Sequence, residues 1–373
     1  DDRTTRWSFR TNRPDATRPR FVAIAQGPLK RPKLPGIPGI ETFEGHSFHT
    51  SRWDYHYTGG NSDGGLNKLH DKVVGIIGTG ATAIQCIPPL AKDAKHLYVF
   101  QRTPSSIDVR HDGPFDSERV ERWGPGWQQR LWENFTALTS GSFVEEDLVR
   151  DGWTSIMANI AHLVEKKQQR GEQVENPMEL AQLADYMKMQ EIRSRVDELV
   201  LDKTAAELLK PWYNRFCKRP GFSDEYLQTF NRHNVTLVDA TVDRGVARIT
   251  ERGAVVGGKE YPLDCLIFST GFDVDNSFTK RVGYGITGRN GFTLERKWAR
   301  GAATMHGFAT HDFPNLFMIS PTQSGFSLNF AHMIDEQTKH VAYILGRAVK
   351  ERIRVVEVTQ AAEDTWVAEV EAS

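Results

Sequence analysis

Short runs of consecutive apolar residues recur along the chain, and their length is typical of buried strands. They occur at residues 21–25, 73–77, 97–100, 235–238 and 265–269, with a further strand expected within 313–321. Within 111–214, apolar residues repeat instead at intervals of three and four, which predicts amphipathic helices. These repeats are Ile156, Ile160 and Leu163, and Met189, Ile192, Val196 and Leu199. With a β-meander expected at 244–262 and a helix at 335–349, the pattern predicts an α/β protein.

A glycine-rich turn follows the strand predicted at 73–77 and opens an apolar helix. It reads G-x-G-x-x-A and consists of Gly78, Thr79, Gly80, Ala81, Thr82 and Ala83. Gly78 permits a tight turn, Gly80 lets the backbone approach a pyrophosphate, and Ala83 keeps the helix close to the sheet. The N-terminus of the helix then faces the anion. This context predicts a dinucleotide-binding turn; the alternative is a glycine turn that only packs a helix on a sheet.

The end of the next strand indicates which dinucleotide binds. An NAD site usually carries Asp or Glu about 20 residues beyond the glycines, where it binds the ribose 2′-hydroxyl. Here the strand ends at Phe100, Gln101 and Arg102, with no acidic residue and one guanidinium. Because a guanidinium suits a 2′-phosphate, these residues favour NADPH. The alternative is that Arg102 only ends a surface strand.

Composition and charge argue against several classes of partner. The 373 residues carry a formal net charge of −1, so neither nucleic acid nor an anionic membrane is an expected partner. No apolar run approaches the ~18 residues of a spanning helix. The three cysteines, Cys86, Cys217 and Cys265, are widely spaced and form no C-x-x-C pair. We therefore expect no disulfide framework and no metal site, and a cytoplasmic location fits best. The sequence does not indicate an oligomeric state.

Residues 43–54 contain a second motif, which reads F-x-G-x-x-x-H-x-x-x-W-D. Its defining residues are Phe43, Gly45, His49, Trp53 and Asp54. By composition alone this segment is a loop with a hydrogen-bonded histidine. Together with the glycine turn that follows, it resembles the fingerprint of type I Baeyer–Villiger monooxygenases, flavoproteins that insert one oxygen atom beside a ketone carbonyl. In that family the motif lies in the linker between the FAD and NADPH domains.

The resemblance extends to the basic pair Lys218 and Arg219. By residue type alone, these two are surface residues. By carry-over from the family, Lys218 assists at the NADPH 2′-phosphate, whereas Arg219 reaches the flavin and the nicotinamide. Arg219 is then the catalytic cation, since a guanidinium stays charged and can stabilise a developing oxyanion. His49 is the second residue with an expected role in catalysis, through orientation or domain coupling rather than proton transfer.

The resemblance implies a fold of two dinucleotide-binding domains, one of them only partly present. The implied divisions are 1–40 (part of the FAD domain), 41–110 (NADP domain with the linker fingerprint), 111–214 (helical insertion), 215–264 (second part of the NADP domain) and 265–373 (C-terminal part of the FAD domain). Further cofactor contacts are expected at two turns, where the chain leaves and re-enters the FAD domain. These contacts are Gly27, Thr270, Gly271, Phe272 and Asp273.

No G-x-G-x-x-G motif for FAD precedes Gly78, so the chain resembles an internal fragment of such an enzyme. We expect the strands at 21–25 and 265–269 to lack a sheet neighbour, which leaves apolar edges exposed. The 373-residue chain is therefore expected to purify without flavin, poorly soluble and inactive.

For the intact enzyme, the resemblance implies FAD- and NADPH-dependent conversion of a ketone and O₂ to an ester or lactone through a C4a-peroxyflavin. One alternative is N- or S-oxygenation by the same flavin, which Trp53 and Asp54 disfavour. Another is a non-catalytic NADP-binding module. Residues 300–307 and 325–330 resemble members of the family that act on bulky cyclic ketones.

Overall fold

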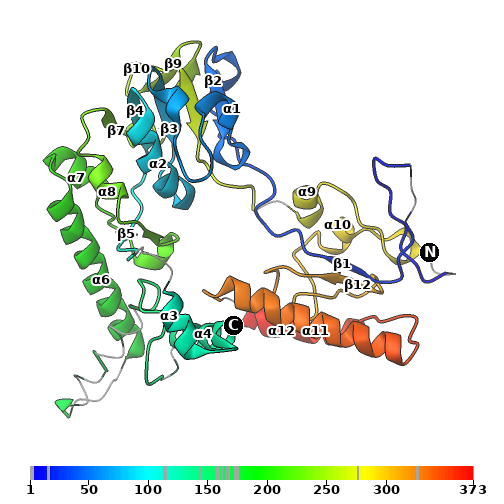
Figure 1. Cartoon of the computed structure of the whole chain (residues 1–373). Helices are drawn as coiled ribbons and strands as arrows, with labels where there is room; N and C mark the ends of the chain where they lie inside the picture. The colour runs from blue at the N-terminus through cyan, green and yellow to red at the C-terminus, as the bar shows by residue number, and fades with distance from the viewer. Residues whose placement is uncertain are drawn as a thin grey trace. The chain divides into compact units, whose positions relative to one another are not determined.

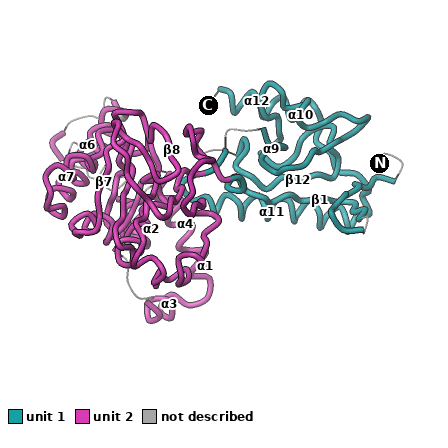
Figure 2. The backbone as a smooth tube through the Cα atoms, turned by 90° about the horizontal axis from the view of Figure 1, so that it is seen from above, with its two compact units in different colours: residues 1–31, 272–373 teal, residues 32–271 magenta. Residues whose placement is uncertain are grey.

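A computed structural model describes residues 4–14, 17–111, 116–140, 142, 144–155, 160, 163–164, 166, 169–171, 176–274, 277–324 and 327–372. The chain forms two compact units (Figure 2): residues 1–31 with 272–373 make up unit 1, and residues 32–271 make up unit 2. Unit 2 is thus a continuous insertion into unit 1. Ile156, and residues 325 and 326 of the second substrate-related segment, lie outside the described residues.

A five-stranded parallel sheet forms the centre of unit 2 (Figure 1), with the strand order β2-β11-β3-β4-β7. The strands are β2 (His46–His49), β3 (Val73–Ile77), β4 (His96–Gln101), β7 (Val235–Asp239) and β11 (Cys265–Phe268). Every residue of β11 is buried, as are the three middle residues of β3. The apolar runs predicted as strands in this part of the chain are confirmed, because a central parallel strand is covered on both faces.

Helices cover one face of this sheet and a meander packs on the other. The helices are α2 (Ala81–Asp93), α6 (Pro177–Leu199), α7 (Lys203–Leu209) and α8 (Tyr226–Thr229), and all four contribute to one apolar core. The meander consists of the antiparallel strands β8 (Arg248–Thr250), β9 (Gly253–Val256) and β10 (Lys259–Pro262). It forms a second core with Phe100, Leu266 and Phe268. The predicted meander is confirmed.

Helix α6 begins with an asparagine cap followed by a proline. The Asn176 side chain accepts a hydrogen bond from the Met178 amide, and Pro177 occupies the first turn. Its buried positions include Met189, Ile192 and Val196, which repeat at intervals of three and four. The other elements of unit 2 are α1 (Tyr55–Thr58), α3 (Ser117–Trp123), α4 (Trp127–Thr139), β5 (Ile107–Asp108), β6 (Gly221–Phe222), and the 3₁₀ turns η1 (Ile40–Thr42), η2 (Thr50–Arg52), η3 (Asn67–Leu69) and η4 (Arg215–Cys217).

Unit 1 contains the parallel pair β1 (Val22–Ile24) and β12 (Leu316–Met318). Its helices are α9 (Phe278–Val282), α10 (Leu294–Lys297), α11 (Phe330–Lys350) and α12 (Gln360–Ala372), with the 3₁₀ turn η5 (Arg289–Gly291). The two strands share a core with Phe313, Ile286 and Leu294. Helix α11 covers the helix expected at 335–349.

Two expectations about the strands are wrong. The strand 265–269 was assigned with residues 1–40, but β11 lies between β2 and β3 in the sheet of unit 2. Neither it nor β1 lacks a neighbour, because β1 pairs with β12. The observed boundaries accordingly fall after residues 31 and 271, rather than at 40 and 265. The physical reason is that an apolar run indicates only that a strand is buried. Which sheet the strand joins depends on its pairing with residues far away in the sequence.

Candidate cofactor-binding and catalytic site

The glycine turn connects β3 to α2 with the geometry of a ligand-binding turn. Gly78 has φ +107°, and a Cβ atom there would lie 2.4 Å from the Ser269 carbonyl oxygen, so only glycine fits. Gly80 is exposed, and a Cβ atom there would meet no described atom within 4 Å. Ala83 is fully buried in the core beneath the helix. The turn therefore leaves open space at the first amides of α2, where a phosphate can bind.

Hydrogen bonds attach the glycine turn to the loop that follows β4. The Thr79 hydroxyl donates to the Thr103 carbonyl at 3.0 Å, and the Ser105 hydroxyl donates to the Thr79 carbonyl at 2.6 Å. Ala81 and Thr82 lie at the first turn of α2, where Thr82 is exposed. The loop carrying Arg102 is thus held beside the glycine turn.

Gln101 and Arg102 have different surroundings at the end of β4. Gln101 is 3% exposed and donates through Nε2 to the Leu208 carbonyl at 2.7 Å. The expectation that its side chain contacts the cofactor is not supported, because it points into the protein interior. Arg102 is exposed. Burial lowers the pKa of Lys218, and the charge of Arg102 lowers it further, which places these two cations close together. An anion such as a 2′-phosphate would relieve their repulsion.

A buried ion cluster fixes the segment that carries Lys218 and Arg219. The Arg215 side chain is 1% exposed, and both Nη atoms donate to Asp108 Oδ2 at 3.2 Å. Lys188 of α6 reaches the same oxygen at 3.0 Å, and Arg215 also donates to the Gly152 carbonyl at 2.9 Å. On the other side of the basic pair, β6 is paired with β5. The backbone of the basic pair is thereby anchored at both ends.

Arg219 is exposed and lines a groove of about 640 Å³. The same groove contains Ala81, the first residue of α2, together with Arg110 and Trp153. The structure therefore brings the predicted catalytic arginine and the glycine turn to one groove within unit 2. A fixed cation beside a dinucleotide turn can orient a bound cofactor and stabilise negative charge on a reacting oxygen.

The fingerprint residues form a packed cluster at the end of β2. Asp54 caps α1 by accepting hydrogen bonds from the amides of His56 and Tyr57. The indole of Trp53 contacts the ring of Phe48 edge-on and donates to the Thr58 hydroxyl at 3.1 Å. The motif thus holds the chain between β2 and β3.

Gly45 and Phe43 of the same motif pack against the start of β11. A Cβ atom at Gly45 would lie 2.4 Å from the Phe43 ring and 2.8 Å from the Asp264 carbonyl oxygen. Only glycine therefore fits at this position of the motif.

His49 reaches the turn at the end of unit 2. Its Nδ1 accepts a hydrogen bond from the Ser51 amide at 3.1 Å. Burial lowers the pKa of His49, and a hydrogen bond with the Gly271 backbone partly opposes that effect. The Thr270 hydroxyl in turn donates to the Lys33 carbonyl at 2.5 Å. His49 therefore contacts the point at which the chain leaves unit 2, and its coupling role stays a prediction.

The residues expected to contact the cofactor at the two turns belong to different units. Gly27, with φ +63°, follows β1, and Phe272 and Asp273 begin the second part of unit 1. Asp273 donates its amide hydrogen to the Arg31 carbonyl at 2.9 Å. Thr270 and Gly271 belong to unit 2. No observation within either unit tests these residues as cofactor contacts.

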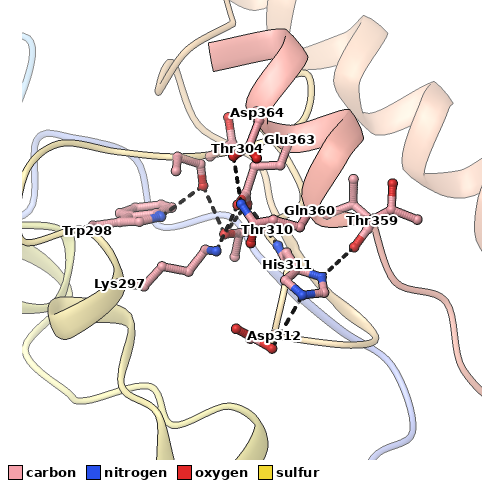
Figure 3. A network of polar contacts seen from close by, with 12 residues as sticks. Lys297, Trp298, Thr304, Thr310, His311, Asp312, Thr359, Gln360, Glu363 and Asp364 are labelled. Atoms are coloured by element: carbon pink, nitrogen blue, oxygen red, sulfur yellow. Dashed lines mark hydrogen bonds and ion pairs between the residues drawn. The ribbon is translucent and has the colours of Figure 1, made fainter. Parts of the chain in front are cut away.

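Unit 1 has a separate polar network centred on Glu363 of α12 (Figure 3). Its buried carboxylate accepts hydrogen bonds from the Thr310 hydroxyl at 2.7 Å and the His311 amide at 2.9 Å, and pairs with Lys297 at 2.8 Å. The carboxylate is fully engaged, so it anchors the C-terminal helix rather than forming a reactive site.

Near this network, His311, Asp312 and Glu357 place possible ligand atoms within 4.8 Å of one another. Glu357 already accepts hydrogen bonds from Arg289, and His311 donates through Nδ1 to the Val358 carbonyl. These interactions occupy groups that a cation would need. The expected absence of a metal stays a prediction. None of the helices in the described part of the chain combines the length and apolar character needed to cross a membrane.

Sequence reasoning missed the residues that support the basic pair. Asp108, Lys188 and Arg215 are charged residues far apart in sequence, and Tyr213 stands in an irregular segment. A weak signal was present, since Tyr213 and Arg215 lie only five and three positions before Lys218. The partner strand β5 lies more than 100 positions earlier, so nothing local indicated the buried cluster.

Comparisons with known proteins agree with this architecture. The chain is 53% identical over 373 residues to neopentalenolactone D synthase of Streptomyces avermitilis, covering 98% of this chain and 62% of that protein. It is 49% identical over 375 residues to a Baeyer–Villiger monooxygenase of Streptomyces coelicolor, covering 99% and 61%. No family model matches the chain.

Solved structures show the same fold. A polycyclic ketone monooxygenase from Thermothelomyces thermophila superposes with a TM-score of 0.84 at 39% identity, covering 98% of this chain and 62% of that one. A complex of the protein OTEMO with FAD and NADP gives a TM-score of 0.78 at 27% identity, covering 100% and 69%. The predicted fold class, an α/β protein with two dinucleotide-binding domains, is confirmed.

Over its length, the chain belongs to the Baeyer–Villiger monooxygenase family. It spans about three fifths of the length of the curated relatives it matches.

Proposed function

We propose that this chain provides the NADPH-binding and catalytic-arginine parts of an FAD-dependent Baeyer–Villiger monooxygenase, which converts a ketone and O₂ to an ester or lactone. One observation carries the proposal: Arg219 and the first turn of α2 line the same groove. Relatives at about 50% identity include a Baeyer–Villiger monooxygenase, and one structural neighbour is a complex with FAD and NADP. A location in the cytoplasm is part of the proposal.

The residues present fit NADPH. The open space at Gly80 accommodates the pyrophosphate at the N-terminus of α2, and Arg102 and Lys218 bind the 2′-phosphate. When bound, FAD supplies the oxygen-transfer chemistry and NADPH the reducing equivalents. The guanidinium of Arg219 stabilises the negative charge that develops on the ketone oxygen by donating hydrogen bonds to it.

A bulky cyclic or polycyclic ketone is the proposed substrate class. The supporting observation is the structural match to a polycyclic ketone monooxygenase at 39% identity. The sequence resemblance at residues 300–307 agrees with this choice.

The experiment is to supply the holoenzyme with NADPH, ¹⁸O₂ and a panel of cyclic and polycyclic ketones, and to identify products by mass spectrometry. A lactone with one ¹⁸O atom supports the proposal. Oxygenation of amines or thioethers with no ester from any ketone contradicts it. A purified protein that binds NADPH but no flavin would instead indicate a non-catalytic NADP-binding module.

Replacement of the catalytic arginine provides the mechanistic test. Arg219→Ala should abolish lactone formation, a loss of about 10²–10³-fold or more for a preorganised donor. NADPH oxidation should then end in hydrogen peroxide. The matched control is Arg248→Ala, which removes an exposed arginine from β8 of the meander. A normal ester yield in the Arg219→Ala variant would exclude this residue from the mechanism.

A further inference from the structure

Two cationic side chains at the proposed 2′-phosphate site come from distant parts of unit 2. Arg102 follows β4, whereas Lys218 follows η4. Both are long side chains with many accessible rotamers, so a phosphate site made from them requires a structure that holds the two segments in register.

Tyr213 contacts both segments. Its hydroxyl donates to the Pro104 carbonyl at 2.9 Å, two residues beyond Arg102. On the other segment, Lys218 Nζ lies 5.4 Å from the centre of the Tyr213 ring, within the range of a cation–π contact.

The backbone on either side of Tyr213 is itself fixed. Arg193 of α6, which is 6% exposed, donates to the Pro211 carbonyl at 3.1 Å. Lys210 forms ion pairs with Asp197 at 2.9 Å and with Glu207. After Tyr213, the buried Arg215 binds Asp108. The tyrosine therefore projects from a rigid support, which a positioning residue needs.

We infer that Tyr213 is a positioning residue that sets the spacing of Arg102 and Lys218 for the 2′-phosphate of NADPH. The inference rests on the proposed NADPH site. The hydroxyl of Tyr213 holds the loop that carries Arg102, and the ring of Tyr213 holds the Lys218 ammonium group over one face. Discrimination between NADPH and NADH then depends on a residue that itself carries no charge.

The test measures binding of two ligands that differ only in the 2′-phosphate, adenosine 2′,5′-bisphosphate and 5′-AMP, to the 373-residue chain by calorimetry. Tyr213→Phe removes the hydroxyl but keeps the ring, and should weaken binding of the bisphosphate about 3- to 10-fold. Tyr213→Leu also removes the ring, and should weaken it roughly 10- to 30-fold. Binding of 5′-AMP should not change with either variant, because this ligand has no 2′-phosphate. A fold defect would instead weaken the binding of both ligands.

A matched control and a double variant complete the design. Tyr57→Phe removes another tyrosine hydroxyl of unit 2, which donates to the Asp264 carbonyl at 3.2 Å, and should leave the ratio of the two dissociation constants unchanged. Adding Tyr213→Leu to Lys218→Met should cost less than Tyr213→Leu alone, because the ring then has no ammonium group to hold.

Two results would overturn the inference. If Tyr213→Leu keeps the wild-type ratio while Arg102→Gln reduces it, Tyr213 has no role and the NADPH assignment stands. If the unmodified chain binds both ligands equally well, the NADPH assignment fails, and the role of Tyr213 fails with it.

Discussion

Replacing Asp108 by asparagine removes the carboxylate that Arg215 and Lys188 share. Both cations lie within 3.2 Å of it, and the side chains of Arg215, Asp108 and Lys188 are 1%, 8% and 11% exposed. Lys188 keeps a second partner, Glu191, at 3.1 Å. The Arg215 guanidinium keeps the Gly152 carbonyl at 2.9 Å and the Phe222 ring, whose centre is 5.7 Å away, but its buried positive charge loses its paired carboxylate.

The expected loss of stability is large because Lys188 keeps a carboxylate partner whereas Arg215 does not. Removing one partner of a buried ion pair typically costs about 3–5 kcal/mol, because the other charge remains in a poorly solvated position. We expect a loss of that size in the free energy of unfolding of unit 2, against a total stability of about 5–15 kcal/mol for a typical domain. The exposed pair Lys92–Glu225, with side chains 58% and 62% exposed, provides the matched control. Glu225→Gln should cost less than about 1 kcal/mol.

Urea unfolding of both variants, followed by far-ultraviolet circular dichroism and tryptophan fluorescence, measures the difference. Trp153 packs against Phe222 of β6, so fluorescence reports on the same region. A second variant that combines Asp108→Asn with Arg215→Met should recover part of the loss, since it removes the unpaired charge. A loss for Asp108→Asn no larger than that for Glu225→Gln would refute the reasoning.

Three further predictions concern the cofactor turn and its neighbours. Arg102→Ala should raise the KM for NADPH about 10- to 100-fold but leave the KM for NADH unchanged, since a charged hydrogen bond contributes about 1.5–3 kcal/mol. If steady-state assays show equal rises in the two KM values, Arg102 is a surface residue that does not bind the cofactor. Gly78→Ala should lower stability by at least about 2 kcal/mol in thermal unfolding, because of its positive φ and the contact with the Ser269 carbonyl, whereas Gly80→Ala should leave stability nearly unchanged. Burial lowers the pKa of His49 in the folded chain below its ordinary value of 6.5. Between the folded-state pKa and 6.5, the unfolded chain therefore binds more protons than the folded chain. The free energy of unfolding should consequently fall as the pH drops below about 6.5. His49→Gln should flatten that dependence between pH 7.5 and 5.5, and an unchanged slope would contradict the cause assigned to the shift.

The sequence predicted the strand, turn and helix around Gly78 well, because every residue that defines them is local. The apolar run, the two glycines and the start of the helix appear in order within 73–93, and the structure has β3 and α2 at these positions. The cap of α6 is equally local, because Asn176 and Pro177 are adjacent in the sequence at the start of the helix.

Long-range pairing explains where prediction failed. The run 265–269 is as apolar as 73–77, and neither run specifies its neighbours in the sheet. Gln101 was expected to contact the cofactor because it ends β4 beside Arg102, but its side chain donates a hydrogen bond to the Leu208 carbonyl of α7. The Asp108–Arg215 pair joins residues 107 positions apart, and charged residues in sequence are usually read as exposed.

The insertion of unit 2 within unit 1 has a consequence for the order of folding during synthesis. Val22 of β1 pairs with Leu316 of β12, which lies 294 positions later (316 − 22). At roughly 5–20 residues per second, the ribosome needs about 15–60 s to produce the partner strand. All of unit 2 leaves the ribosome in that interval, and its first and last segments meet through the hydrogen bond from the Lys33 amide to the Gly271 carbonyl. Unit 2 can therefore complete its sheet before β12 is synthesised, so β1 pairs with β12 only after the whole of unit 2 has left the ribosome.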